Sequence, residues 1–169
     1  PQVRLNDDYD EMLLHLAKYM NTDLVWIHPS QTVNEGSLAY ALNQMGIPTM
    51  VTESGSAFRI RYEYCRQIID GIFSVMAELG IWKGKTNGKN DVPFINEDKI
   101  CYLNCEFSGL FVSYKRLKDR VKKGEIIGII QNPLMGATEE EVIAPVDGIL
   151  MTLREHPSVA EGSLVARVI

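Results

Sequence analysis

Residues 143–148 read Ile-Ala-Pro-Val-Asp-Gly, and they separate two similar segments in the second half of the chain. The first segment (109–130) and the second (148–168) each contain a Val-x-x-Gly turn, at 121–124 and at 159–162, followed by aliphatic residues. Each segment predicts a strand, a loop, the turn and a second strand. One copy cannot bury its apolar face alone, so we expect the two copies to pack about a pseudo-twofold axis. The alternative is a chance similarity between two β-hairpins.

This β-rich half resembles the lipoyl-like barrel-sandwich module. The resemblance rests on the Ala-Pro-x-Asp-Gly element within 143–148 and on the two Val-x-x-Gly turns. In the carriers of that family, a lysine at an exposed hairpin tip takes biotin or lipoate. The equivalent stretch here, 132–139, contains no lysine, which argues against a carrier function. The resemblance in fold says nothing further about chemistry.

The first half of the chain alternates between helical and strand patterns. The apolar runs 24–27 and 47–52 predict two buried strands, and residues 62–79 predict a long amphipathic helix. Between these two strands in the sequence, we expect a helix that begins after Gly36 and has Leu38 facing the core. Strands that alternate with helices indicate parallel pairing. Because two strands do not make an independent sheet, we expect this half to be the end of a larger sheet.

A polar stretch at 83–93, which contains Gly, Asn and Lys, separates the two patterns. Such a composition predicts a linker or a surface loop. The sequence therefore predicts two domains, with residues 1–85 as the C-terminal part of an α/β domain and residues 86–169 as a β module. Since the first residue is proline, we expect the chain to be a piece of a longer protein.

Composition excludes several classes of protein. The 17 basic and 22 acidic residues give a net charge of −5, which argues against binding to nucleic acid or to an anionic membrane. No apolar run reaches the roughly 20 residues of a membrane span. The three cysteines (Cys65, Cys101 and Cys105) are too few and too scattered for a disulfide framework. We therefore expect free thiols and a cytoplasmic protein.

Nearly the whole chain resembles the C-terminal half of the succinylglutamate desuccinylase/aspartoacylase family. The match begins with Gly-Ser-Leu-Ala at 36–39, continues through Gly-Ile-Pro-Thr-Met-Val-Thr-Glu-Ser-Gly at 46–55, and follows the long helix and the β module to Ile169. The resemblance implies the end of a mixed, mainly parallel sheet of the zinc-carboxypeptidase type, followed by an all-β barrel-sandwich-hybrid module. It also implies a zinc-dependent deacylase that hydrolyses amide bonds of N-acyl amino acids or similar small molecules.

Glu53 is the best candidate for a catalytic residue. It directly follows a predicted buried strand, at the end where open parallel sheets place their ligands. By resemblance, Glu53 matches the family's catalytic glutamate, which takes a proton from water as a general base and returns it to the leaving amine as a general acid. From its position alone, Glu53 could equally be a solvated loop residue.

The resemblance also implies one zinc ion in the intact protein. The family binds zinc through a His-x-x-Glu motif and a more distant histidine, and zinc needs about three protein ligands. His15, His28 and His156 are each followed by other residues at the third position, so none fits the motif. We therefore expect the metal ligands to lie upstream of this chain, with no metal ligand within it.

Three further residues lie near the predicted site. Arg59 and Arg61 follow the Glu53 loop, and either could bind a substrate carboxylate through its fork of donors. The alternative is that both arginines are only surface cations near the start of a helix. His28 ends the first predicted strand and could line the same cleft, or it could be a loop histidine before proline.

The leading hypothesis is therefore a fragment of a zinc-dependent amidohydrolase with a small-molecule N-acyl substrate and Glu53 as general base and acid. An open sheet edge would favour a homo-oligomer. The alternative is a non-catalytic binding or assembly module with the same fold.

Overall fold

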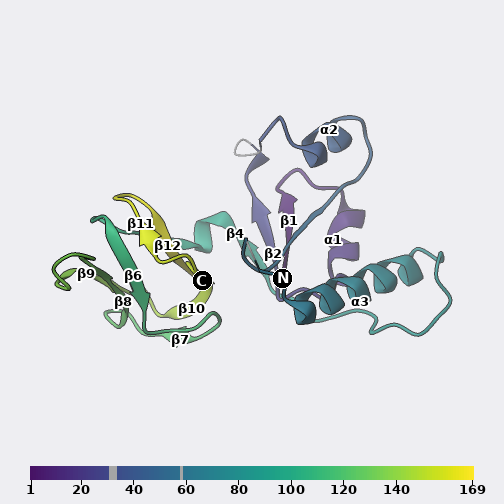
Figure 1. Cartoon of the computed structure of the whole chain (residues 1–169). Coiled ribbons are helices and arrows are strands. Elements are labelled where there is room, and N and C mark those ends of the chain that lie inside the picture. The colour runs from purple at the N-terminus through teal and green to yellow at the C-terminus, as the bar shows by residue number, and fades with distance from the viewer. Residues whose placement is uncertain (31–33, 58) are drawn as a thin grey trace. The chain divides into compact units, whose positions relative to one another are not determined.

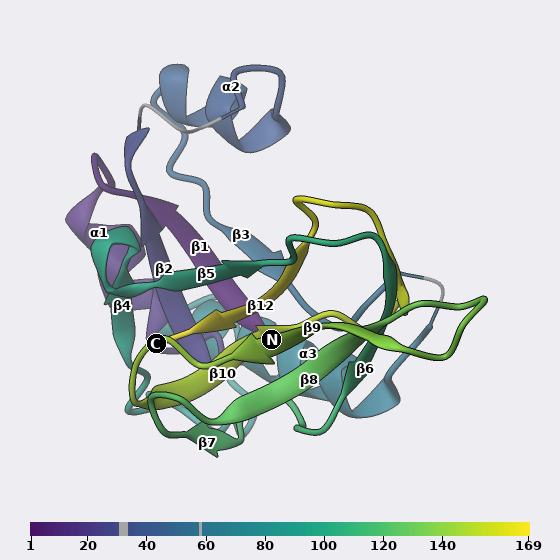
Figure 2. The ribbon, with the colours of Figure 1, turned by 90° about the vertical axis from the view of Figure 1, so that its left-hand side faces the viewer.

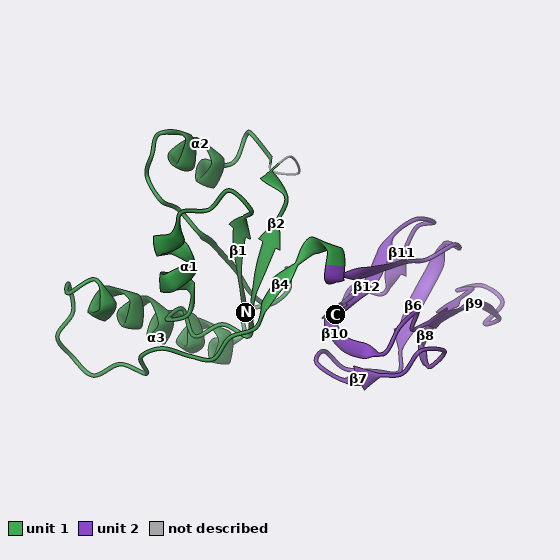
Figure 3. Ribbon diagram, turned by 180° about the vertical axis from the view of Figure 1, so that it is seen from behind, with its two compact units in different colours: residues 1–98 green, residues 99–169 purple. Residues whose placement is uncertain are grey.

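The computed structural model of the chain describes residues 1–30, 34–57 and 59–169. They form two compact units, Pro1–Asp98 and Lys99–Ile169 (Figure 3). Each unit has its own buried apolar core. Within the described residues, no helix is both long enough and apolar enough to cross a membrane.

The first unit contains a four-stranded sheet with the order β3-β1-β2-β4 (Figure 1). Strands β1 (Gln2–Asn6), β2 (Leu24–His28) and β4 (Phe94–Asn96) run parallel, and β3 (Val51–Glu53) runs antiparallel to β1. The sheet is therefore mixed, as the family resemblance implies. The run 24–27 predicts β2 correctly, whereas β1 and β4 have no counterpart among the predicted strands.

Within the described residues of this unit, three α-helices accompany the sheet. Helix α1 (Glu11–Ala17) begins after Asp10, whose carboxylate accepts a hydrogen bond from the backbone N–H of Met12. Helix α2 (Leu38–Gln44) begins after Ser37, whose hydroxyl caps the first turn in the same way. Helix α3 (Tyr62–Glu78) confirms the predicted helix at 62–79. Helix α2 has no buried residue, so the expectation that Leu38 faces the core is wrong.

The core of the first unit lies between one face of the sheet and helices α1 and α3, which cover the same side (Figure 1). Alternate strand residues such as Val3 and Val25 point into this core because side chains alternate between the faces of a strand. A Cβ atom at Gly71 of α3 would fall 2.0 Å from the Met20 carbonyl oxygen. Glycine at this position therefore allows α3 to pack directly on the Met20 backbone.

The predicted buried strand at 47–52 is wrong in its extent, burial and pairing. The Asn43 side chain accepts from the Thr49 backbone N–H at 2.7 Å and donates to the Thr49 carbonyl at 3.0 Å. Because α2 occupies both backbone groups of Thr49, regular pairing begins only at Val51, on an exposed edge strand. This strand pairs with β1, so it is antiparallel to its neighbour instead of parallel.

The polar stretch at 83–93 ends beside the first sheet. Asn90 donates its backbone N–H to the carbonyl of Lys18, and Val92 is buried in the first core. The short strand β4 then pairs with β2, with Ile95 opposite Trp26. Residues up to Asp98 therefore lie in the first compact unit, beyond the boundary at 85/86 that the sequence predicts.

The second unit is all β apart from the end of a 3-10 turn, η2 (Glu97–Lys99). It has two four-stranded sheets, with the orders β5-β12-β10-β7 and β11-β6-β8-β9; in the second sheet β6 and β8 lie side by side (Figure 2). The strands are β5 (Cys101–Asn104), β6 (Gly109–Ser113), β7 (Arg120–Val121), β8 (Ile126–Gln131), β9 (Thr138–Ile143), β10 (Gly148–Leu153), β11 (Ser158–Val159) and β12 (Leu164–Val168). Residues 99–169 are all described, and their sheets do not close into a barrel.

The internal repeat appears in the strand pairing of this unit. Strand β7 of the first copy pairs with β10 of the second copy, with Val121 opposite Gly148. Strand β11 of the second copy pairs with β6 of the first copy, with Val159 opposite Gly109. Each copy thus contributes its short strand to the sheet that contains the other copy. Both valines are buried in one shared core, which is the mutual packing that the repeat predicts.

Candidate functional site

Glu53 is the last residue of β3 and pairs with Gln2, the first residue of β1. The carboxyl end of β3 therefore lies beside the amino end of β1, because the two strands are antiparallel. This differs from the expected position, at the edge where parallel strands end together. Long side chains on β1 contact the Glu53 carboxylate, and one of them, Arg4, also contacts His28.

The polar face of the sheet gathers these side chains through strand periodicity. Register pairs Arg4 with Trp26 and with Val51, and Gln2 with Glu53, so these side chains share one face. His28 follows Trp26 by two positions and lies on the same face. The opposite face carries the apolar core cluster of this unit, whereas this face combines the polar side chains with the buried Trp26.

Arg4 contacts two of the candidate residues at once. Its Nη1 donates to Glu53 Oε1 at 2.8 Å, and its Nε donates to His28 Nε2 at 2.7 Å. The second carboxylate oxygen of Glu53, Oε2, accepts from the Gln2 side-chain amide at 3.0 Å. Both oxygens of Glu53 are therefore held, one by a cation and one by a neutral amide.

His28 is buried and connects Arg4 to a second carboxylate. Its Nδ1 lies 3.3 Å from Glu97 Oε2, and the same oxygen accepts from Trp26 Nε1 at 2.8 Å. The rings of Trp26 and His28 lie 4.0 Å apart, and the Arg4 guanidinium lies 5.1 Å from the centre of the Trp26 ring. A continuous set of contacts thus runs from Glu53 through Arg4 and His28 to Glu97.

The environment of Glu53 changes its pKa in two opposing ways. Partial burial raises the pKa, whereas the hydrogen bond and charge of Arg4 lower it, with smaller contributions from the Gln2 amide and from the positive charge of His28 when protonated. The net effect holds the pKa below its ordinary value of 4.5. Glu53 is therefore a carboxylate at neutral pH.

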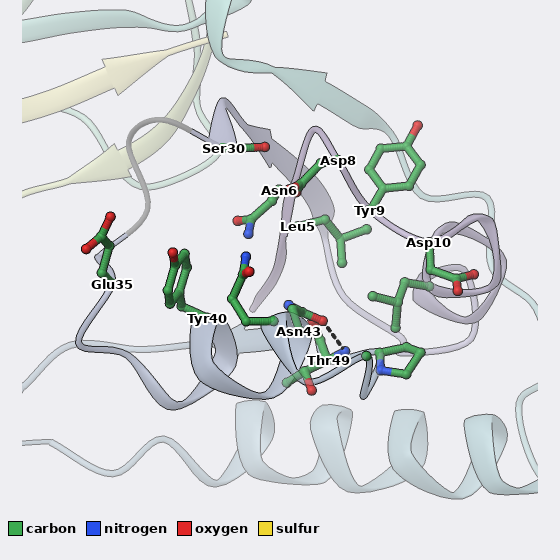
Figure 4. A pocket seen from close by; sticks show the side chains of 14 residues that line it. Leu5, Asn6, Asp8, Tyr9, Asp10, Ser30, Glu35, Tyr40, Asn43 and Thr49 are labelled. Carbon is green, nitrogen blue, oxygen red and sulfur yellow. Dashed lines mark hydrogen bonds between the residues drawn. The ribbon is translucent and has the colours of Figure 1, made fainter.

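Two adjoining cavities lie beside this network in the first unit. One, of about 260 Å³, is lined by Arg4, His28 and Glu53 together with residues of α2. The other, of about 470 Å³, is lined by acidic and amide side chains together with apolar and aromatic ones such as Leu5 and Tyr9 (Figure 4). Four residues line both cavities: Asn6, Tyr40, Asn43 and Thr49. The dashed line in Figure 4 is the hydrogen bond between Asn43 and Thr49 that shapes their shared wall.

The structure brings together only some of the residues that the sequence identifies. Glu53 and His28 line the same cavity, and Arg4 links them. Arg59 and Arg61 are exposed, and neither lines the two cavities described above. A substrate-binding role for these two arginines stays a prediction.

Sequence reasoning missed Arg4 and Glu97. Residues 2–6 alternate between polar and apolar side chains (Gln-Val-Arg-Leu-Asn), and that pattern alone could have identified β1 and the outward direction of Arg4. Nothing local marks Glu97, which follows a three-residue strand.

The described residues do not fit a zinc site. No group of three His, Cys, Asp or Glu side chains within them is placed to hold a metal ion. Both ring nitrogens of His28 lie within hydrogen-bonding distance of other side chains, and both oxygens of Glu53 accept hydrogen bonds. The ring nitrogens of His28 and the carboxylate oxygens of Glu53, which could otherwise bind a metal ion, therefore already contact other protein groups.

No protein-family model and no curated protein matches the chain, but solved structures do. A succinylglutamate desuccinylase/aspartoacylase from Rhodobacter sphaeroides matches with a TM-score of 0.78 and 22% identity over 99% of this chain and 52% of its own. The product-bound ectoine utilization protein EutE (DoeB) from Ruegeria pomeroyi matches with a TM-score of 0.83 and 20% identity over 98% of this chain and 52% of its own. An aspartoacylase family protein from Mesorhizobium loti matches with a TM-score of 0.75 and 16% identity.

The chain spans about half the length of each of these proteins. At these identities the likeness is one of fold, and it extends across both compact units because nearly the whole chain is covered. The chain therefore has the fold of about half of a succinylglutamate desuccinylase/aspartoacylase protein, consistent with the C-terminal half that its sequence resembles.

Proposed function

We propose that this chain is part of a deacylase that hydrolyses the amide bond of an N-acyl amino acid or a similar small molecule. The observation that carries the proposal is the position of Glu53, whose carboxylate lines a cavity of about 260 Å³ in a chain with this fold. The adjoining cavity of about 470 Å³ offers space for the rest of such a substrate.

In this proposal Glu53 moves the proton. Its lowered pKa keeps it ionised at neutral pH, and the carboxylate is the form that can accept a proton from an attacking water. A C–O bond then forms at the substrate carbonyl. Protonated Glu53 next donates its proton to the amide nitrogen, so the C–N bond breaks and a neutral amine leaves. The carboxylate is restored at the end of the cycle.

Oε2 of Glu53 is the oxygen suited to this transfer. Oε1 is bound by the cationic Arg4, which disfavours protonation there. Oε2 accepts from the neutral amide of Gln2 in an exposed contact, which a water molecule can replace. We therefore assign the proton to Oε2.

The proposal includes one zinc ion in the intact protein, as the family resemblance implies. Since the described residues supply no set of ligands, we place these ligands outside them. The residues of this chain contribute the proton-transfer group and the walls of the cavity.

For the second unit we propose the barrel-sandwich-hybrid type without a carrier function. The reciprocal exchange of β7 and β11 between the two sheets supports this type. The turn between β8 and β9 includes Leu134 and Met135, both strongly exposed, where a carrier would need its lysine.

A non-catalytic binding module is the second candidate function. The observation that favours it is the ion pair between Arg4 and Glu53, because a carboxylate held at a lowered pKa is a weaker base. In that case the two cavities would bind a small ligand without turnover.

Amine release by the intact protein separates the two functions. A panel of N-acyl amino acids is incubated with zinc-loaded protein, and free amine is measured. A deacylase releases amine from at least one member with saturation kinetics. Binding of a panel member, detected by calorimetry, without release of amine would instead identify the binding module.

A further inference from the structure

We propose that Arg4 is the positioning residue for Glu53, and that His28 fixes Arg4 by presenting an unprotonated Nε2 to it. This inference rests on the proposed function of Glu53 for its effect on turnover. The contacts that carry it lie in the first unit and involve residues from β1, β2, β3 and the η2 turn.

The first step is the geometry of Arg4. A guanidinium is planar and its donors point in fixed directions, so two hydrogen bonds from different nitrogens determine its plane. Nη1 binds Glu53 at 2.8 Å and Nε binds His28 at 2.7 Å. The guanidinium carbon lies over the Trp26 ring, 5.1 Å from its centre, so the ring contacts Arg4 as well. Arg4 therefore holds Oε1 of Glu53 in one direction.

The second step is the protonation state of His28. Arginine is only a donor, so the short contact from Arg4 Nε requires a lone pair on His28 Nε2. The proton of the neutral ring then lies on Nδ1, 3.3 Å from Glu97 Oε2. Glu97 is itself fixed by the Trp26 indole N–H at 2.8 Å. The geometry thus selects the Nδ1–H tautomer of His28.

The contact between Arg4 and His28 lies beside buried side chains. His28 is 8% exposed and Trp26 is 3% exposed, so these two residues shield the contact on the side of the acceptor, whereas the Arg4 side chain as a whole is 36% exposed. Removal of the His28 acceptor leaves the Nε donor of Arg4 without its protein partner beside two buried side chains. Arg4 would then reorient, and Glu53 would lose its fixed direction while its own chemistry stayed intact.

Two substitutions at His28 test this role. Phenylalanine keeps a planar ring of similar size but has no acceptor. Glutamine offers a side-chain oxygen close to the position of Nε2, so it can still accept from Arg4. We expect His28→Phe to lower the turnover number of the intact protein by about 10-fold, with a change in KM below about 3-fold, because one hydrogen bond to a charged group contributes about that factor. We expect His28→Gln to restore turnover to within about 3-fold of the wild type.

The tautomer is measured independently of activity. In intact protein labelled with ¹⁵N-histidine, long-range ¹H–¹⁵N spectra at neutral pH distinguish a protonated ring nitrogen from an unprotonated one. The signals of His28 are identified by their loss in His28→Phe. We expect protonated Nδ1 and unprotonated Nε2.

The outcomes separate this inference from the proposed function. A protonated Nε2 on His28 overturns the inference whatever the activity. Wild-type turnover in His28→Phe, in a protein where Glu53→Gln abolishes turnover, overturns the positioning role alone. Wild-type turnover in Glu53→Gln overturns the proposed function, and with it the claim that Arg4 positions a catalytic group. The Nδ1–H tautomer together with the Phe and Gln results above supports the inference.

Discussion

Arg4 Nη1 lies 2.8 Å from Glu53 Oε1, so an ion pair joins the middle residue of β1 to the last residue of its antiparallel neighbour β3. The pair combines two opposing effects. It keeps Glu53 ionised and oriented, which a proton acceptor needs, and it lowers the pKa of Glu53, which weakens it as a base. The other oxygen of Glu53, Oε2, contacts only the neutral amide of Gln2, which water can replace. In the proposed function, Oε1 therefore keeps the carboxylate oriented while Oε2 accepts the proton.

The ion pair predicts a pH-dependent stability difference for Glu53→Gln. The folded-state pKa of Glu53 is lowered, so its stabilising contribution is present above the unfolded pKa and is lost as pH falls through the folded pKa. The side chains of Arg4 and Glu53 are 36% and 46% exposed, so solvent screening limits the effect to about 0.5 kcal/mol at pH 7. Urea denaturation at pH 7 and in acid, well below pH 4.5, measures it.

We expect the variant to be less stable at pH 7 and to approach the wild type in acid. Glu161→Gln, at an exposed turn of the second unit, is the matched control and should change little at either pH. An equal loss of stability for Glu53→Gln at both pH values would show that the ionised carboxylate has no part in it.

Because the two copies of the repeat exchange their short strands, we expect equivalent substitutions in the two copies to lower the free energy of unfolding by equal amounts. Val121 and Val159 occupy the same place in the two copies, and both are buried in the shared core. Each valine-to-alanine substitution should lower the free energy of unfolding by about 1–3 kcal/mol, with the two values within about 0.5 kcal/mol of each other. Val146→Ala, at a partly exposed position, is the control and should cost less. Thermal and urea unfolding give the numbers, and a large inequality would argue against the pseudo-twofold arrangement.

Limited proteolysis should cut the chain first within residues 83–89. This stretch is exposed and polar, whereas Asn90 is anchored to Lys18 and Val92 is buried. Mass spectrometry of the early fragments identifies the site. A fragment that starts in this stretch and retains the whole second unit is expected, and first cuts inside residues 100–169 would contradict the prediction.

The isolated chain should self-associate through apolar side chains of its first unit. Ile69, Ile72 and Phe73 of α3 remain between 37% and 50% exposed, and Ile81 and Trp82 beyond the helix are also exposed. Light scattering should show a dimer or a larger species, and Ile69→Glu with Ile72→Glu should shift it toward the monomer. A monodisperse wild-type monomer would count against this prediction.

The repeat and the long helix could be predicted from the sequence because their signals are local. Gly124 and Gly162 follow the equivalent valines at the same spacing, and both have positive φ angles (86° and 80°), which glycine adopts without strain. The long helix likewise could be predicted from the helical periodicity of the apolar residues at 62–79 alone.

The candidate site could be predicted only in part because its residues meet through long-range pairing. Strand ends identify Glu53 and His28, but the position of Arg4 depends on β1, which the sequence analysis does not predict, and that of Glu97 depends on β4 joining the edge of the sheet. The contacts between Asn43 and Thr49, which precede the first paired residue of β3, are encoded by no periodic pattern. Helical periodicity predicts Leu38 in the core, but Leu38 is exposed on α2, because periodicity does not reveal whether a neighbour covers the apolar face.

The most direct test of the account is the turnover of Glu53→Gln in the intact protein with an accepted N-acyl substrate. Glutamine keeps the shape and the contact with Arg4 but cannot take the proton, so turnover should fall by about 10²–10⁴-fold. Zinc content should stay at the wild-type level, since Glu53 is assigned to proton transfer and not to the metal. Ser54→Ala, at the next residue, is the control and should be nearly neutral. Near-normal turnover of Glu53→Gln with unchanged zinc would contradict the account.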